Sequence, residues 1–330
     1  MVQAHPLPEH DQALVSGVLA GQRRALAKAI TLIESTRADH QQRARQVLGA
    51  LLPKTGQAIR LGISGVPGAG KSTFIEALGI WLIERGKHLA VLAIDPSSSV
   101  NGGSILGDKT RMELLSQREE AFIRPSPSAG SLGGVAEKTR EAMLLCEAAG
   151  YDVIIVETVG VGQSETAVAG MVDMFCLLQL PNAGDDLQAI KKGIVEIADM
   201  VVINKADIDP RATAVARSQW KNALHMLRPA SPRWSPPVMA LSALHKEGIA
   251  EFWTQVENYQ AALKPGGEFD ARRRHQSLAW MWQLIDSGLR QHFRGHPRVQ
   301  ENLPALVSAV EEGRSTPAAA AHTLLDYLKH

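Results

Sequence analysis

The stretch Gly65-Val66-Pro67-Gly68-Ala69-Gly70-Lys71-Ser72 decides the fold of this 330-residue chain. It matches the pattern G-x-x-x-x-G-K-[ST], in which glycines let successive backbone N–H groups approach phosphate oxygens. A short apolar run, residues 59–64, precedes it, and apolar residues at helical spacing follow in residues 73–82. The alternative interpretation is a glycine-rich turn that merely precedes a lysine. Such a turn would require neither the strand before it nor the helix after it. The order of strand, loop and helix therefore predicts a P-loop that binds a nucleoside triphosphate.

Each residue type in this loop has a defined task when a nucleotide is bound. The backbone N–H groups and the positive end of the following helix attract phosphate oxygens. Lys71 is expected to reach the β- and γ-phosphates, and the Ser72 hydroxyl is expected to bind Mg²⁺. The nucleotide-binding residues predicted in this segment are Gly65, Pro67, Gly68, Ala69, Gly70, Lys71, Ser72 and Thr73.

A second motif, Asn204-Lys205-Ala206-Asp207, directly follows the apolar run of residues 200–203. The Asp207 carboxylate can accept hydrogen bonds from both N1–H and the exocyclic amine of guanine. Adenine has no matching pair of donors and would leave the carboxylate buried and unpaired, which is costly. Asn204 is expected to fix the loop and contact the base edge, and the Lys205 stem to cover the purine face. The backbone contacts predicted for the guanine carbonyl come from Ser242, Ala243 and Leu244. The predicted ligand is therefore GTP or GDP.

Carboxylates end two further apolar runs. Glu157 follows residues 153–156, where it can bind Mg²⁺, and the backbone N–H of Gly160 can contact the γ-phosphate. Asp95 follows residues 88–94 and is well placed for a water-mediated contact to Mg²⁺. Most P-loop GTPases carry Asp where this chain has Glu157, so the glutamate indicates a subclass. An acidic helix cap is the alternative for Glu157, and a turn rich in caps is the alternative for Asp95. The predicted Mg²⁺ ligands are Ser72, Asp95 and Glu157.

Apolar runs alternate with helical segments from residue 59 to about residue 263. The runs predicted to be strands are residues 59–64, 88–94, 120–124, 152–156, 174–180, 200–203 and 237–241. Most are continuously apolar, which is typical of parallel strands covered on both faces. The predicted fold class is α/β: a doubly wound, mostly parallel P-loop GTPase sheet with right-handed crossovers. In such sheets the site lies at the carboxyl ends of the strands.

Helical patterns without strands occupy both ends of the chain. We expect an N-terminal helical region (residues 1–58), a P-loop GTPase domain (residues 59–263) and a C-terminal helical region (residues 264–330). The C-terminal region carries an apolar helical stripe formed by Leu278, Met281, Trp282, Ile285 and Leu289. This stripe is predicted to meet its equivalent in a second chain and form a homodimer. Packing back onto the sheet domain is the alternative.

The composition is that of a globular protein with a sizeable core. It is 45% hydrophobic, and 35 Lys+Arg residues nearly balance 34 Asp+Glu residues. This balance predicts no general attraction to nucleic acid or to an anionic membrane. No apolar run approaches the roughly 20 residues that span a bilayer, and the start of the chain resembles neither a signal nor a transit peptide. Cys146 and Cys176 stand in apolar segments and are interpreted as buried, reduced thiols. We therefore expect a cytoplasmic location.

Several longer motifs together resemble one family. They are Asp95-Pro96-Ser97-Ser98-Ser99, GSILGDKTRM at residues 103–112, RPSP at residues 124–127 with Gly133-Gly134, VETVGVGQSE at residues 156–165 and LPNAGDDLQ at residues 180–188. Across about residues 60–243 the chain is similar to the MeaB/ArgK family, which is related to the signal-recognition-particle and nickel-insertion GTPases. The resemblance implies a chaperone for adenosylcobalamin-dependent methylmalonyl-CoA mutase. Such a GTPase would gate cofactor loading and protect the mutase.

The resemblance also implies roles that chemistry alone does not assign. Matching positions give the phosphate, Mg²⁺ and switch residues as Lys71, Ser72, Asp95, Asp108 and Glu157, so the predicted catalytic residues are Lys71, Asp95, Asp108 and Glu157. An exposed loop carboxylate is the alternative for Asp108. Residues 182–193 are interpreted as a loop that reports the nucleotide state to a partner, with a solvated loop as the alternative. The residues predicted for this switch or partner loop are Asp185, Gln188 and Lys191.

Hydrolysis is expected to be an in-line attack of water on the γ-phosphate, with Lys71 and Mg²⁺ neutralising the developing charge. Arg111 is the one candidate for an arginine finger, and no residue is identified that positions the water. Slow intrinsic turnover, stimulated by the partner, is therefore predicted.

Four other functions remain as alternatives. A nickel-type metallochaperone GTPase would need clustered cysteines and histidines. A small-molecule P-loop kinase would lack a guanine reader, and a membrane-targeting switch would need an anchoring surface. A GTPase chaperone for a different cobalamin-dependent acyl-CoA mutase would share all the motifs above.

Overall fold

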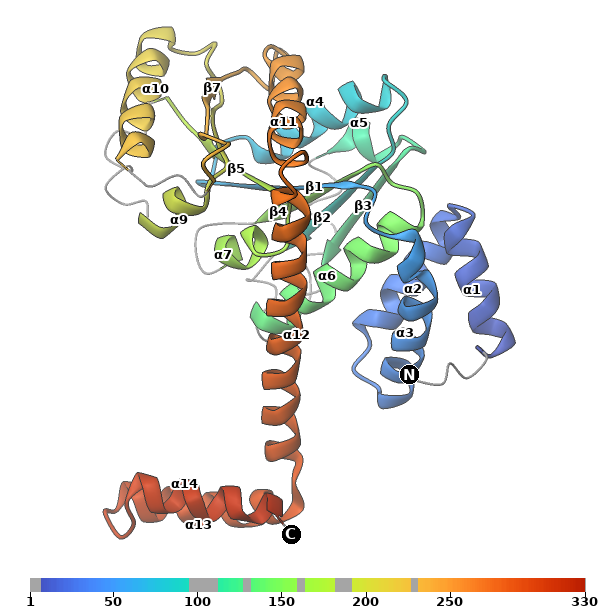
Figure 1. The fold of residues 1–330 in the computed structure, drawn as a ribbon, viewed down its shortest axis with the longest axis vertical. Helices are drawn as coiled ribbons and strands as arrows, with labels where there is room; N and C mark the ends of the chain where they lie inside the picture. Colours follow the sequence, from blue (N-terminus) through green and yellow to red (C-terminus); the bar gives the residue numbers. More distant parts are fainter. Residues whose placement is uncertain are drawn as a thin grey trace. The chain divides into compact units, whose positions relative to one another are not determined.

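A seven-stranded parallel sheet forms the centre of the protein (Figure 1). The computed structural model describes residues 7–94, 112–126, 132–158, 164–181, 192–226 and 231–329. The strand order is β3-β2-β4-β1-β5-β6-β7, and every neighbouring pair is parallel. The strands are β1 (Ile59–Gly65), β2 (Leu89–Ile94), β3 (Ala121–Ser126), β4 (Val153–Thr158), β5 (Met174–Gln179), β6 (Met200–Ile203) and β7 (Val238–Ala240). The predicted fold class is confirmed.

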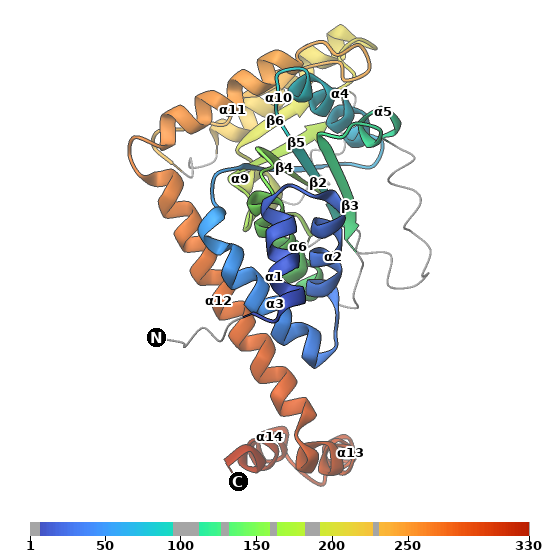
Figure 2. The same ribbon diagram turned by 90° about the vertical axis from the view of Figure 1, so that its right-hand side faces the viewer.

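Helices cover both faces of this sheet (Figures 1 and 2). In the sheet-containing part of the chain they are α1 (Glu9–Leu19), α2 (Arg23–Glu34), α3 (Ala38–Leu51), α4 (Lys71–Ile83), α5 (Glu113–Ser116), α6 (Leu132–Ala148), α7 (Ser164–Ala169), α9 (Lys192–Ile197), α10 (Pro210–His225) and α11 (Ile249–Leu263). One buried apolar cluster joins α4, α5 and α11 to one face. A second cluster joins the other face to α6, α7, α9 and α10 and includes side chains of α1, α2 and α3.

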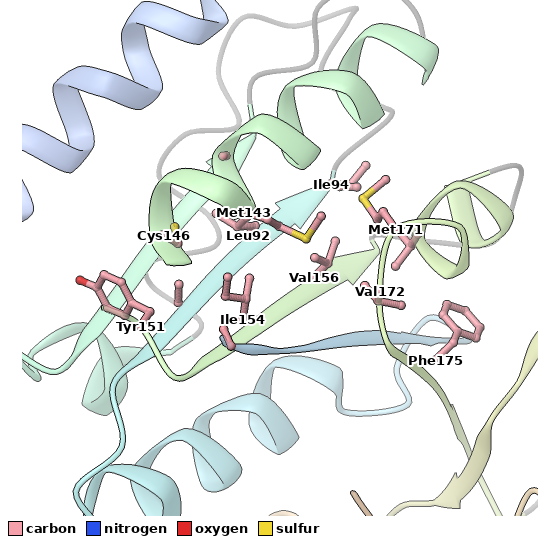
Figure 3. Packing of buried hydrophobic residues seen from close by; sticks show 14 of the residues in the cluster. Leu92, Ile94, Met143, Cys146, Tyr151, Ile154, Val156, Met171, Val172 and Phe175 are labelled. Atoms are coloured by element: carbon pink, nitrogen blue, oxygen red, sulfur yellow. The ribbon is translucent and has the colours of Figure 1, made fainter. Parts of the chain in front are cut away.

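Alternation along the strands divides the core between the two faces. Val153 and Ile155 of β4 belong to the cluster with α4, whereas Ile154 and Val156 belong to the cluster with α6. Successive strand residues point to opposite faces, so a strand covered on both sides must be apolar throughout. Figure 3 shows Ile154 and Val156 beneath Met143 of α6. This double burial explains why apolar runs predicted the strands.

The chain divides into two compact units, Met1–Arg273 and Arg274–His330. The first unit contains the sheet and the three N-terminal helices. The second contains most of α12 (Glu268–Gly295), with α13 (Pro297–Glu311) and α14 (Pro317–Asp326) packed against each other. The finer division into residues 1–58, 59–263 and 264–330 stays a prediction. No described helix has the length and apolar character required to cross a membrane.

Candidate functional site

The P-loop leaves β1 at the centre of the sheet, between β4 and β5. Its glycines are required by the backbone. Gly68 and Gly70 have φ angles of 79° and 84°, in the left-handed region that other residues rarely adopt. A Cβ on Gly65 would lie 2.3 Å from the carbonyl oxygen of Leu178, so glycine allows β1 to approach β5 at this point. The loop then enters α4, which begins at Lys71.

The start of α4 presents positive groups to this loop. The first intrahelical bond runs from the N–H of Phe74 to the carbonyl of Gly70, so the N–H groups before it have no acceptor within the helix. Lys71 Nζ lies against the loop and donates to the carbonyl oxygens of Gly65 at 2.8 Å and Val66 at 3.4 Å. A cation and a helix N-terminus in one place form an arrangement suited to phosphate oxygens.

Two of the predicted Mg²⁺ ligands lie together. The Ser72 hydroxyl donates to Glu157 Oε1 at 3.4 Å, across the boundary between α4 and β4. Glu157 is 5% exposed and is paired in register with Ile63 of β1, which holds its carboxylate beside the P-loop. A hydroxyl and a carboxylate are hard oxygen donors, the kind that Mg²⁺ prefers. The residues present therefore fit a magnesium ion. The third predicted ligand, Asp95, lies outside the described residues.

A cavity of about 280 Å³ adjoins the P-loop and is formed by the segments that follow β6 and β7. Its lining residues are Gly70, Thr73, Asn204, Lys205, Asp207, Ile208, Ser242, Ala243 and Leu244. Sites for whole drug-sized ligands span about 300–1,000 Å³, so this volume suits one base rather than a complete nucleotide. The structure thus brings the two predicted base-binding segments into one cavity, with the phosphate-binding loop as its neighbour.

Asn204 joins the three segments around this cavity. Its Nδ2 donates to the carbonyl oxygen of Ala69 at 2.8 Å, and its Oδ1 accepts from the backbone N–H of Ala243 at 3.0 Å. The side chain is 2% exposed. A Cβ on Gly70 would lie 2.6 Å from Asn204 Nδ2, so glycine at this position lets the amide approach the loop. The structure shows how Asn204 fixes the loops, whereas its contact with a base edge stays a prediction.

Asp207 is held as an anion at the cavity. A hydrogen bond from the Ser242 side chain is the largest cause of its lowered pKa, and His245, whose Nε2 lies 3.6 Å from Asp207 Oδ2, also lowers it. Lys205 has a φ of 59°, a strained conformation for a residue with a side chain, and such strain is concentrated at functional sites. The cavity therefore presents a fixed negative charge, suited to a ligand edge with two donors.

Two residues at this site, Ile208 and His245, are not predicted from the sequence. Ile208 lines the cavity, as Leu244 does, and these two apolar residues are 70% and 72% exposed. A large apolar side chain directly after the N-K-x-D motif, in a polar loop, was the available signal for Ile208. Nothing in the sequence indicated that His245 would approach Asp207.

Seven of the predicted functional residues lie outside the described residues. They are Asp95, Asp108, Arg111, Gly160, Asp185, Gln188 and Lys191. Their roles stay predictions.

A larger cavity, of about 640 Å³, lies where Asp199 precedes β6, at the amino end of that strand. Two of its charged side chains, those of Arg272 and Asp199, form an ion pair. Arg272 donates to both carboxylate oxygens of Asp199, at 3.0 and 2.9 Å. Of the predicted nucleotide-binding residues that the structure describes, none lines this cavity, whereas several line the smaller one, at the carboxyl ends of the strands where such sheets bind ligands.

The two cysteines lie on opposite faces of the sheet. Cys146 belongs to the buried cluster with α6, and Cys176 to the buried cluster with α4. Burial raises the pKa of both thiols, which keeps them protonated. They cannot be ligands of one metal ion. Across the part of the chain that the structure describes, no group of three or more His, Cys, Asp or Glu side chains could hold a metal.

A family model described as "Methylmalonyl Co-A mutase-associated GTPase MeaB" matches residues 26–298. The chain belongs to the MeaB family. It is 56% identical over 308 residues to a "Putative GTPase" of Caulobacter vibrioides, which covers 93% of this chain and 94% of the relative. It is 48% identical over 310 residues, 94% of each chain, to "GTPase ArgK" of Escherichia coli. This MeaB-family protein is a GTP hydrolase and binds guanine nucleotides.

A solved structure agrees with the MeaB-family fold. The protein in "Crystal structure of LAO/AO transport system kinase" is 39% identical and superimposes with a TM-score of 0.78, covering 99% of this chain and 100% of that one. Fold and sequence similarity therefore extend over nearly the whole chain, including the helices at both ends.

Proposed function

We propose that this MeaB-family GTPase is a chaperone of adenosylcobalamin-dependent methylmalonyl-CoA mutase. It gates the loading of the cofactor and protects the mutase. The observation that carries the proposal is the match of the family model over residues 26–298, since the description of that model names a mutase-associated GTPase. The cavity beside the P-loop supports it, because a chaperone timed by GTP needs a site that distinguishes guanine from adenine.

The geometry of the cavity and the P-loop supports the nucleotide-binding roles that we propose. Asp207 would accept the two guanine donors, and the backbone of residues 242–244 would contact the guanine carbonyl. The P-loop and the first turn of α4 would hold the phosphates, with Lys71 at the β- and γ-oxygens. Ser72 and Glu157 would bind Mg²⁺ together with Asp95. When bound, the ion would neutralise the charge that develops on the phosphate oxygens during hydrolysis.

Hydrolysis would be slow until the partner binds. In this proposal Lys71 stabilises charge in the transition state, Asp95, Asp108 and Gly160 belong to the nucleotide-sensing segments, and the mutase supplies or orders what positions the attacking water. The segment with Asp185, Gln188 and Lys191 would report the nucleotide state to the mutase. GTP hydrolysis would then time the transfer of the cofactor.

The test is co-purification of the full chain with methylmalonyl-CoA mutase and with other cobalamin-dependent acyl-CoA mutases. Each pairing is made with GDP and with a non-hydrolysable GTP analogue, and the GTPase rate and cofactor transfer are measured. We expect a nucleotide-dependent complex with methylmalonyl-CoA mutase and faster hydrolysis in it. A complex with another mutase alone would reassign the partner. If no mutase forms such a complex, the chaperone proposal is wrong, although the GTPase assignment stands.

We also propose that α12 forms a homodimer. Leu278, Trp282 and Leu289 are 58%, 60% and 63% exposed, although they are large and apolar. Their spacing of four and seven residues places them on one side of the helix, with Met281 and Ile285 beside them. Exposed apolar surface of this kind is typical of an interface. A second copy of the chain carries the same stripe and would cover it.

A further inference from the structure

One buried polar side chain near the nucleotide site has no role in the functions above. Gln179 is the last residue of β5 and is 1% exposed. Within the described residues, neither its Nε2 nor its Oε1 has a hydrogen-bond partner. A glutamine amide carries two donors and an acceptor, and burial without partners is unfavourable. Such a group in a core requires an explanation.

The strand alternation places this amide on the α7 face of the sheet. Phe175 and Leu177 of β5 belong to the buried cluster that includes α7, whereas Cys176 and Leu178 belong to the cluster with α4. Gln179 lies two residues beyond Leu177, so its side chain points to the same face of the sheet as those of Phe175 and Leu177. Figure 3 shows Phe175 on this face, near Met171 and Val172, which follow α7.

Gln179 has polar neighbours at the same edge of the sheet. Ser64 of β1 is in register with Leu177, so Gln179 lies diagonally beyond it. The hydroxyl of Thr158, at the end of β4, donates to Ser64 Oγ at 2.8 Å, and both residues are fully buried. The hydroxyls of Ser64 and Thr158 are thus hydrogen-bonded to each other, whereas the amide of Gln179 has no hydrogen-bond partner among the described residues.

The backbone of Gln179 connects it to both halves of the nucleotide site. Its carbonyl oxygen accepts from the N–H of Asn204 at 2.9 Å, at the start of the base-binding segment. The preceding residue, Leu178, is in register with Gly65 of the P-loop. The face to which its side chain points is covered by α7, whose first residues, Ser164 and Glu165, are themselves buried and polar. Gln179 therefore lies between the nucleotide and α7.

We propose that Gln179 is a positioning residue that couples the γ-phosphate to α7. Its amide gains a hydrogen-bond partner on the α7 side of the sheet when GTP is bound and loses that partner with GDP. A hydrogen bond at a site shielded from water is strong, and the unpaired group is correspondingly costly. The Gln179 side chain thereby stabilises the GTP-bound arrangement relative to the GDP-bound arrangement. The proposal rests on GTP binding and does not depend on the identity of the mutase.

The test is Gln179→Met, which keeps the length of the side chain and removes its hydrogen-bonding groups. We expect the preference for a non-hydrolysable GTP analogue over GDP, measured as the ratio of the two dissociation constants in Mg²⁺, to fall about tenfold, or about 1.4 kcal/mol. The variant should melt at the same or a higher temperature than the wild type with GDP, because an unpaired amide has been replaced by an apolar group.

An amide with a purely structural role predicts the opposite pattern. Gln179→Met would then melt at a lower temperature with either nucleotide, and the ratio of dissociation constants would be unchanged. An unchanged ratio overturns the proposal, whatever the melting temperature. If the methionine variant does not fold, Gln179→Leu provides the same comparison.

Thr139→Val is the matched control. It removes a buried hydroxyl on the same face of the sheet, where Thr139 Oγ1 donates to the carbonyl of Val135 within α6 at 2.8 Å. It should leave the nucleotide ratio unchanged. A similar fall in this control would show that any loss of core polarity alters the ratio, and would overturn the role assigned to Gln179.

Discussion

Asn204 Nδ2 donates a hydrogen bond to the carbonyl oxygen of Ala69 at 2.8 Å, so the base-binding segment is bonded directly to the P-loop. The same amide accepts from Ala243 N–H through its Oδ1 at 3.0 Å. One buried side chain therefore sets the spacing between the predicted base-binding segment and the P-loop. We expect the binding of the two ends of the nucleotide to be coupled through it.

Asn204→Ala should weaken GDP and GTP binding to the same extent. The substitution leaves the Ala69 carbonyl and the Ala243 N–H without this partner, at a cost of about 1–3 kcal/mol, and the affinity should fall by roughly 10- to 100-fold. Titration with fluorescent guanine nucleotides measures it. Asn222→Ala, at an exposed position of α10, is the matched control and should have no effect. Wild-type affinity in Asn204→Ala would contradict the linking role.

Asp207→Asn should change the base that is preferred. An asparagine presents one acceptor and one donor where the carboxylate presents two acceptors, which matches the N1–H and C2 carbonyl of xanthine. We expect GDP affinity to fall by about 10- to 100-fold and affinity for xanthosine diphosphate to rise. Competition between the two nucleotides measures the change. A variant that still prefers guanine would show that Asp207 does not read the base.

The pH dependence of guanine binding should depend on Ser242. The hydrogen bond from Ser242 lowers the Asp207 pKa, so the favourable charge is present at neutral pH and is lost only as the pH falls through that lowered value. Protonation of Asp207 should therefore weaken GDP binding by the wild type only below the region near pH 3.9 in which an Asp ordinarily titrates. In Ser242→Ala the affinity should begin to fall at a higher pH. Identical pH profiles for the two proteins, with folding checked by circular dichroism, would contradict this.

The sequence predicted those parts of the molecule whose cause is local. Strands buried on both faces require continuous apolar runs, and the P-loop requires glycines, so both are visible in the order of residues. The contacts that join distant segments have no such signal. Asn204 and Ala69 are 135 positions apart, and their hydrogen bond depends on the strand order of the sheet.

The burial of Gln179 is another feature that the sequence does not predict. In the sequence Gln179 is one polar residue near the end of the apolar run 174–180, as expected where a strand approaches solvent. Only the structure shows that it is 1% exposed and lies two residues beyond Leu177 on the α7 face. The hydrogen bond from Ser242 to Asp207 was missed for a similar reason, because the sequence predicted only a backbone role for Ser242.

Glu157→Gln should raise the Mg²⁺ requirement for GTP hydrolysis. Glu157 Oε1 lies 3.4 Å from the Ser72 hydroxyl, and an amide is a weaker ligand for a hard cation than a carboxylate. The Mg²⁺ concentration for half-maximal activity should increase about tenfold or more, and chelation should abolish hydrolysis in the wild type. Glu84→Gln, at an exposed position just after α4, is the control. An unchanged Mg²⁺ requirement would remove Glu157 from the proposed ligands.

Trp282→Glu should separate the proposed homodimer into monomers. Trp282 is 60% exposed in the single chain, and a buried tryptophan at the centre of an interface commonly contributes 2 kcal/mol or more. The charge would also lack a partner against the apolar stripe of a second copy. Light scattering after size-exclusion chromatography should show dimers for the wild type and monomers for the variant. Ser287→Glu places the same charge on the other side of α12 and should stay dimeric. A monomeric wild type at micromolar concentration would contradict the proposal. Intrinsic GTP hydrolysis should be the same in all three proteins, because Trp282 and Ser287 belong to the second unit and not to the unit that contains the P-loop.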